Sequence, residues 1–194
     1  MTVTISDIYL KEVSSGKLVK AELHDSIQQT HLDHHDQHWK PVTTKLKEQQ
    51  GHWDWQKKWT HYSTQLSFQS FAIECNGETQ GMMIVNTIMR CQIPQQANKH
   101  LVYVEYLEAA PWNRRTVTNT PKYKLVGTVM IAAAIQLSLD EGNQGRIGLH
   151  SLPQADTFYR DQCGMTDLGR DASKQSLFYF EMTEAQAVQY MQGR

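Results

Sequence analysis

Cysteine is scarce in this chain. The 194 residues contain three, Cys75, Cys91 and Cys163, an odd number with no CxxC spacing. A disulfide framework or a zinc knuckle needs cysteines paired at short spacing, so neither is expected. A basic surplus is also missing, because 19 Lys and Arg stand against 20 Asp and Glu. Proteins that bind nucleic acids carry such a surplus, so the composition argues against DNA or RNA as a partner.

Long apolar runs are missing as well. The longest, around residues 125–139, is interrupted by Thr128, Gln136 and Ser138 and is too short to span a bilayer. Residues 1–7 lack the basic and apolar regions of a secretory signal. With 40% apolar and 20% charged residues, the composition is typical of a folded domain. We therefore expect a cytoplasmic protein with no membrane association.

No repeat or linker divides the chain, so a single domain over residues 1–194 is expected, with a helical part at 1–66 and a sheet-forming part at 67–194. Residues 17–29 are predicted to form a helix, because their apolar residues recur near helical spacing. These apolar residues are Leu18, Val19, Leu23 and Ile27.

A histidine-rich run follows at residues 31–39. If it is helical, His31 pairs with His35 and His34 with His38 at a spacing of four, a geometry that can bind a divalent metal. The run is polar and has no HExxH order, so we expect a solvated helix face and no metal.

Three tryptophans, Trp53, Trp55 and Trp59, stand close together after this run. Large aromatic side chains usually fill a core, and that is the expectation here, with an acceptor-binding pocket as the alternative. Cys163 has no base near it in sequence and is expected to be buried and inert.

From residue 67 the pattern changes to strands. Apolar residues on both sides of Asn76-Gly77 predict a hairpin, because its turn needs positive φ. Further strands are expected at 100–107, 146–152 and 177–182, and helices at 123–140, at 154–162 and from 183 onward. This order predicts an α/β (α+β) fold with a central mixed sheet and a strand-to-helix crossover within 101–140.

Residues 107–127 have the features of a phosphate site. A strand ends, a polar loop follows, and a helix begins whose unpaired N–H groups and dipole favour an anion. Gly127, one turn into the helix, allows close approach to the backbone. Four cations gather in this stretch: Arg114, Arg115, Lys122 and Lys124.

At this point the chain resembles the GNAT (Gcn-related N-acetyltransferase) family. The family's pyrophosphate loop reads Arg/Gln-x-x-Gly-x-Gly/Ala, and the matching segment here is Lys122-x-x-Leu125-x-Gly127, with Leu125 in place of the first glycine. Residues 107–111 look like the family's strand ending before this loop. Residues 155–165 are similar to its Ala-x-x-Leu/Phe-Tyr-x-x-x-Gly-Phe segment. The resemblance covers residues 101–181, and the first hundred residues match only in element order.

The resemblance implies a GNAT fold, a mostly antiparallel sheet flanked by helices with a crossover helix after the fourth strand. It also implies acetyl transfer from acetyl-coenzyme A to a small-molecule or peptide amine, without a metal. A backbone N–H within 107–109 would polarise the thioester oxygen. Dimers are common in the family, so a homodimer is an alternative to a monomer. The residues expected to contact coenzyme A are Leu107, Ala109, Lys122, Tyr123, Lys124, Leu125, Val126, Gly127, Thr128 and Tyr159.

Three residues are candidates for proton transfer. By the resemblance, Tyr159 protonates the leaving thiolate. Glu105 and Glu108 lie on opposite faces of one predicted strand, and Glu105 is the preferred general base. The alternative is that both carboxylates are surface residues or ion-pair residues beside Arg114 and Lys122. If the side chain at Leu125 weakens cofactor binding, the chain would instead be a catalytically silent coenzyme A sensor or a partner-binding module.

Overall fold

The computed structural model describes residues 4–46 and 49–193, so Met1–Val3 of the N-terminal segment lie outside the described residues. The strands are β1 (Thr4–Glu12), β2 (Leu18–His24), β3 (Phe68–Cys75), β4 (Glu78–Arg90), β5 (His100–Ala109), β6 (Tyr123–Lys124), β7 (Ile147–Ser151), β8 (Thr166–Asp171) and β9 (Leu177–Met182). The α-helices are α1 (Gln29–His34), α2 (Lys40–Lys45), α3 (Trp55–Tyr62), α4 (Val126–Asp140) and α5 (Glu184–Gln192). Shorter helical segments are η1 (His35–Trp39), η2 (Gln49–His52), η3 (Pro94–Gln96), η4 (Pro111–Asn113), η5 (Pro153–Ala155), η6 (Phe158–Gln162) and η7 (Ala172–Lys174).

The strands are hydrogen-bonded in the order β6-β1-β2-β3-β4-β5-β7-β9-β8. The sheet is mostly antiparallel, while β5 and β7 are parallel and are connected through α4. A parallel pair needs such a crossover, because its strands run in the same direction. The predicted fold class and the crossover helix are therefore confirmed. No helix among residues 4–46 and 49–193 is long and apolar enough to cross a membrane.

The chain divides into two compact units. Unit 1 comprises Met1–Ile84 and Tyr106–Met130, and unit 2 comprises Val85–Glu105 and Ile131–Arg194. The elements β4, β5 and α4 pass from one unit into the other. The expectation of a single domain over 1–194 stays a prediction.

The helix predicted at 17–29 is wrong, because this stretch contains the strand β2, paired with β1. Within β2 the polar residues Lys20, Glu22 and His24 alternate with Val19, Ala21 and Leu23, and Ala21 and Leu23 are buried. Period-two alternation places all the apolar residues on one face of a strand. It outweighs the weaker match to helical spacing.

The histidine-rich run is helical, as α1 followed by the π-helix η1, but the expected solvated face is wrong for two of its residues. His31 and His35 are each only 2% exposed, while His38 is exposed. A buried imidazole is tolerated when its nitrogens find partners. The Nδ1 atom of His31 accepts a hydrogen bond from the Gln28 backbone N–H at 3.0 Å.

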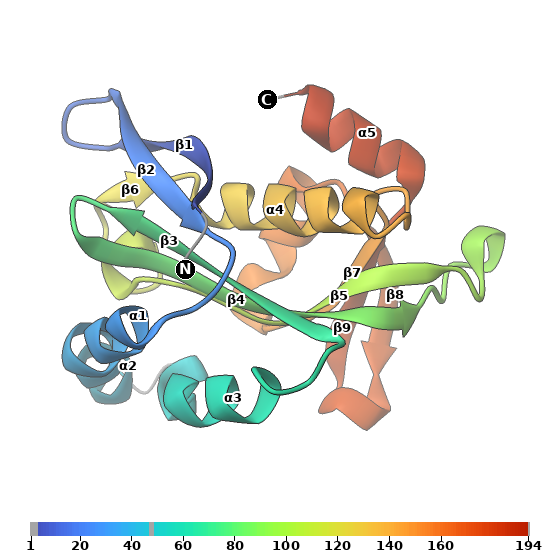
Figure 1. Cartoon of the computed structure of the whole chain (residues 1–194), viewed down its shortest axis with the longest axis horizontal. Helices are drawn as coiled ribbons and strands as arrows, with labels where there is room; N and C mark the ends of the chain where they lie inside the picture. Colours follow the sequence, from blue (N-terminus) through green and yellow to red (C-terminus); the bar gives the residue numbers. More distant parts are fainter. Residues whose placement is uncertain (1–3, 47–48, 194) are drawn as a thin grey trace. The chain divides into compact units, whose positions relative to one another are not determined.

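The core of unit 1 is aromatic, as predicted for the tryptophans. Trp39 and Trp55 are fully buried, and Trp53 and Trp59 pack against the same cluster. Figure 1 shows α1, α2 and α3 following one another along one side of β3 and β4. The hairpin between those strands is confirmed, with positive φ at Asn76 (53°) and Gly77 (74°).

In unit 2 the strands β7 and β9 were predicted, and β8, which pairs with β9, was missed. The helix expected at 154–162 is instead the short segment η5 followed by the π-helix η6. The terminal helix α5 starts with a capping box, in which Thr183 accepts from the Gln186 backbone N–H. Cys163 is buried, as expected.

Candidate functional site

The start of α4 is the predicted phosphate site, and the helix begins at Val126 rather than at Tyr123. Tyr123 and Lys124 instead form β6, which pairs with Glu12 and Lys11 of β1. The Leu125 carbonyl accepts the first hydrogen bond of α4, from the Val129 N–H at 2.9 Å. The loop after β5 therefore returns to the sheet edge before the helix starts.

Leu125 adopts the left-handed conformation, with φ of 78°. This region favours glycine, and a residue with a Cβ atom loses about 1–2 kcal/mol there. The position is the one at which the GNAT pyrophosphate loop has its first glycine. Leu125 therefore adopts a conformation that glycine favours, and its side chain is 39% exposed.

A leucine in the capping position has no side-chain acceptor for the first N–H groups of the helix. The amides of Val126 and Gly127 belong to the first turn, where the helix itself supplies no acceptor. With the dipole of this 15-residue helix behind them, these amides favour an anion. Gly127 and Thr128, both expected to contact coenzyme A, are half-buried in this turn.

A buried glutamine on β4 holds the loop that leads to this turn. Gln80 is fully buried, and its Oε1 accepts hydrogen bonds from Trp112 Nε1 at 3.0 Å and Asn113 Nδ2 at 2.8 Å. The Asn113 Oδ1 in turn accepts from the Tyr123 N–H at 2.9 Å. This chain of hydrogen bonds fixes η4 against β6, and the sequence analysis had identified none of Gln80, Trp112 and Asn113.

A glycine on β4 allows the first turn of α4 to pack closely. A Cβ atom on Gly81 would lie 2.8 Å from Cγ1 of Val126 and 3.1 Å from Cε of Met130. Real Cβ atoms essentially never lie as close as the 2.8 Å to Val126, so a larger residue at position 81 would force the side chain or backbone at the start of α4 to shift.

The four predicted cations divide into two pairs. Lys124 and Arg115 are exposed. The Lys122 ammonium forms an ion pair with Glu78, and Arg114 Nη2 lies 3.7 Å from Oε1 of Glu108. Partial burial lowers the pKa of Lys122, but the hydrogen bond and charge of Glu78 outweigh it and raise the pKa above its ordinary value.

Glu108, one of the two candidate bases, is 2% exposed and surrounded by partners. Its Oε2 accepts a hydrogen bond from Trp55 Nε1 at 2.6 Å, and His35 Nε2 lies 3.7 Å from the same oxygen. Burial lowers the pKa of His35, so that ring is neutral near pH 7. These contacts fit the ion-pair alternative for Glu108. Its neighbours Leu107 and Ala109 are half-buried at the end of β5.

An ammonium group sits among aromatic rings at the same end of β5. The Lys58 Nζ lies 3.4 Å from the ring centroid of Tyr106 and 5.1 Å from that of Trp53. The two rings meet edge to face, with centroids 5.2 Å apart. A cation over such rings is stabilised by their negative faces.

The other two candidates for proton transfer lie in unit 2. Glu105 is half-buried on β5. Tyr159 is buried in η6, with its ring near those of Phe158 and Phe180. Burial raises the pKa of Tyr159, so its phenol is protonated and can act as a donor.

Unit 2 also contains a hydrogen-bonded chain that the sequence analysis missed. The Tyr103 hydroxyl lies 2.6 Å from His150 Nδ1, and His150 Nε2 lies 3.0 Å from Oδ2 of Asp171. Burial lowers the pKa of His150, with Asp171 opposing the shift. The His150 ring is therefore a neutral group able to take a proton. The three residues of this hydrogen-bonded chain come from β5, β7 and β8, and they are too far apart in sequence to form a recognisable motif.

No family model and no curated protein sequence matches the chain. Solved structures do. The GNAT domain of S. lividans PAT has 11% identity and a TM-score of 0.58, over 91% of this chain and 95% of that one. The chain has the GNAT fold. Spermidine N-acetyltransferase from Vibrio cholerae, in complex with CoA and spermine, has 14% identity and a TM-score of 0.57, over 87% and 98%. The N-acyl amino acid synthase FeeM from uncultured soil microbes has 12% identity and a TM-score of 0.58, over 86% and 93%.

Within this GNAT fold the segment that matches the family's pyrophosphate-loop motif contains a residue in the left-handed conformation, Leu125. The spacing from Lys122 to Gly127 located the turn before α4, although the motif glycine is a leucine. The residues that hold the turn in place, Gln80 and Asn113, had no sequence signal, because their partners lie in other elements.

Proposed function

We propose that this chain is an N-acyltransferase that moves an acetyl group from acetyl-coenzyme A to an amine. The observation that carries the proposal is Leu125, which adopts a left-handed backbone conformation directly before helix α4 in a GNAT fold, at the position where the family's pyrophosphate loop has its first glycine. A glycine-type conformation retained by a leucine, at some loss of stability, indicates that the turn is needed.

The diphosphate of coenzyme A would accept hydrogen bonds from the amides of Val126 and Gly127, with the exposed Lys124 adding charge. The amine nitrogen attacks the thioester carbonyl carbon, the C–N bond forms and the C–S bond breaks. A proton leaves the amine for a base, and the thiolate takes a proton from Tyr159. Holding both reactants on one protein contributes roughly 7–11 kcal/mol in well-oriented systems.

Glu105 is the base that we favour. Glu108 is tied by Trp55 and lies beside Arg114, so its carboxylate is better suited to positioning the end of β5. Tyr103, on the same face of β5 as Glu105, is hydrogen-bonded to His150 and offers a second route for the proton. Replacing Glu105 with glutamine should lower kcat and leave coenzyme A affinity unchanged.

The acceptor is proposed to be a small cationic amine. The support is the Lys58 ammonium between Trp53 and Tyr106, which shows that this pair of rings accepts a positive charge. The similar structure from Vibrio cholerae binds spermine, itself a polycation.

Calorimetric titration with coenzyme A and acetyl-coenzyme A tests the cofactor half of the proposal. Micromolar binding is expected, and Lys124→Glu should weaken it about tenfold while Lys45→Glu, an equal charge change on the exposed face of α2, leaves it unchanged. Thiol release is then measured against a panel of amines. Binding with no turnover for any amine favours the silent coenzyme A sensor, and no binding overturns the proposal.

A further inference from the structure

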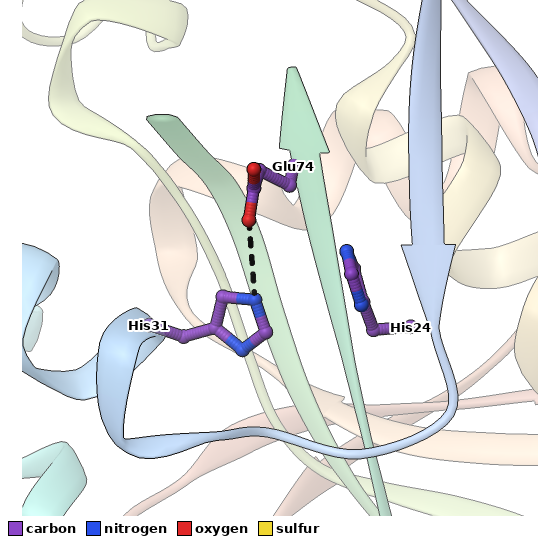
Figure 2. A group of neighbouring side chains, drawn as sticks. All are labelled: His24, His31 and Glu74. Atoms are coloured by element: carbon purple, nitrogen blue, oxygen red, sulfur yellow. Dashed lines mark ion pairs between the residues drawn. The ribbon is translucent and has the colours of Figure 1, made fainter. Parts of the chain in front are cut away.

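Two histidines and a carboxylate meet in unit 1, in a group distinct from the Glu108 cluster. His24 ends β2, His31 lies on α1, and Glu74 lies on β3. Figure 2 shows the His31 ring pointing toward the Glu74 carboxylate, with His24 beside them, and 3.8 Å separates His31 Nε2 from Glu74 Oε2. One ligand atom from each of the three residues lies within 4.8 Å of the other two.

The strand register brings like charges together at this place. In the β2–β3 ladder Glu22 stands directly opposite Glu74, and His24 shares their face of the sheet. Like charges opposite each other in a ladder destabilise the pair. A cation held between these groups would remove the repulsion.

His24 lacks hydrogen bonds as well. Both of its ring nitrogens are buried, and among the described residues neither has a hydrogen-bond partner. Its Nε2 lies 3.6 Å from Oε2 of Glu22, beyond hydrogen-bond distance. Buried polar atoms are nearly always satisfied, so a ring with two unsatisfied nitrogens calls for an explanation. A metal ion bound at one of them would provide it.

We propose that His24, His31 and Glu74 bind a divalent transition-metal ion, with Zn²⁺ the best match to the ligands. Two imidazole nitrogens and one carboxylate oxygen are a set that zinc accepts, with water in the fourth position. Ligand atoms in a tetrahedral zinc site lie about 3.3 Å apart, so the pair His31–Glu74 needs only a small movement. This proposal replaces the sequence-based expectation of no metal, which treated the histidine run as a solvated face.

A cavity of about 270 Å³ gives an ion access to this group. His31 and Glu74 line it together with Asp33 and His34, so an ion that enters the cavity meets carboxylate and imidazole groups. An entry path of this kind is one of the requirements for a functional metal site.

Metal binding has a structural consequence at the start of α1. In the metal-free protein His31 Nδ1 accepts the Gln28 N–H, so the neutral ring carries its proton on Nε2. A metal at Nε2 moves that proton to Nδ1, where it faces another donor, and the hydrogen bond from Gln28 breaks. The amide of Gln28 therefore reports on metal binding at His31.

The test uses untagged, chelator-treated protein. Calorimetric titration with ZnCl₂ should show one ion per chain with micromolar or tighter affinity, and Co²⁺ should give the visible absorption of a tetrahedral site. Glu74→Gln keeps the shape of the side chain and should weaken zinc binding at least about tenfold. His24→Asn should do the same. In NMR spectra of the wild-type protein the Gln28 amide should shift on zinc addition.

His38→Asn is the matched control, because His38 is an exposed histidine of the same run whose ring lies 4.7 Å from that of His34. It should leave zinc binding unchanged. The proposal is overturned if zinc does not bind at several hundred micromolar. It is equally overturned if His38→Asn abolishes binding while Glu74→Gln does not, since the ion would then be bound by His34 and His38. Thermal melts of each variant without metal show that it is folded.

Discussion

Replacing Leu125 by glycine and by alanine separates the effect of its backbone from that of its side chain. Both changes remove the isopropyl group beyond the Cβ atom, so they lose the same apolar contacts of that group. They differ only in the Cβ atom, which is disfavoured at a φ of 78° by about 1–2 kcal/mol. Glycine loses more conformational entropy on folding than alanine, and this offsets about 0.5–1 kcal/mol of its advantage at position 125. Leu125→Gly is therefore expected to be more stable than Leu125→Ala by about 1 kcal/mol.

Urea unfolding followed by tryptophan fluorescence measures this difference. Gln136, an exposed residue inside α4, provides the matched control, because its backbone has ordinary helical geometry. There glycine should be the less stable variant, by about 1 kcal/mol. The sign of the glycine–alanine difference must therefore reverse between positions 125 and 136. An alanine variant at 125 as stable as the glycine variant would refute the left-handed conformation and, with it, the pyrophosphate-loop argument.

Further predictions concern stability, pH and the acceptor. Glu108→Gln should lower the free energy of unfolding by about 2–4 kcal/mol in urea, because it removes the buried carboxylate that forms an ion pair with Arg114; a loss below about 0.5 kcal/mol contradicts this. Gly81→Ala should cost about 1–3 kcal/mol and also weaken coenzyme A binding in calorimetry, since its Cβ atom collides with the start of α4. Burial holds the pKa of His150 below its ordinary value, so the unfolded chain takes up the proton first and stability falls as the pH drops below about 6.5, by at most about 1.4 kcal/mol per pH unit. His150→Asn should flatten the profile of unfolding free energy against pH, and an unchanged profile argues against a neutral ring. Lys58→Met should lower the KM for a cationic amine several-fold, while Lys57→Met, on the same helix but 85% exposed, should not; equal effects would place the acceptor elsewhere.

How far the sequence predicts this fold depends on whether the deciding interaction is local. The Asn76-Gly77 hairpin was predicted because its turn chemistry is contained in two adjacent residues. The helix proposed at 17–29 failed because Val19, Leu23 and Ile27 fit both a helical period and a period of two, and pairing with β1 decides between them.

In the candidate site, too, local features were predicted and features that depend on distant residues were not. The spacing of Lys122 and Gly127 indicated a turn at a helix start, which the structure has one turn later than predicted. The hydrogen bonds that Gln80 accepts come from Trp112 and Asn113 of η4, more than thirty residues away, and nothing in the local sequence marks them. The burial of His31 and His35 had no signal either, because their polarity alone predicts exposure.

The turn before α4 combines two unfavourable choices in adjacent positions. Leu125 loses about 1–2 kcal/mol to its left-handed backbone, and a capping residue without an acceptor loses about 1 kcal/mol more. Together they amount to a sizeable part of the 5–15 kcal/mol that typically holds a domain folded. A glycine at 125 would remove the first loss. Yet the buried Gln80 and the close contact at Gly81 hold this turn in place from β4. Buried hydrogen bonds to Gln80 of β4 therefore hold a strained turn directly before a helix start, and the first amides of a helix favour an anionic ligand such as a diphosphate.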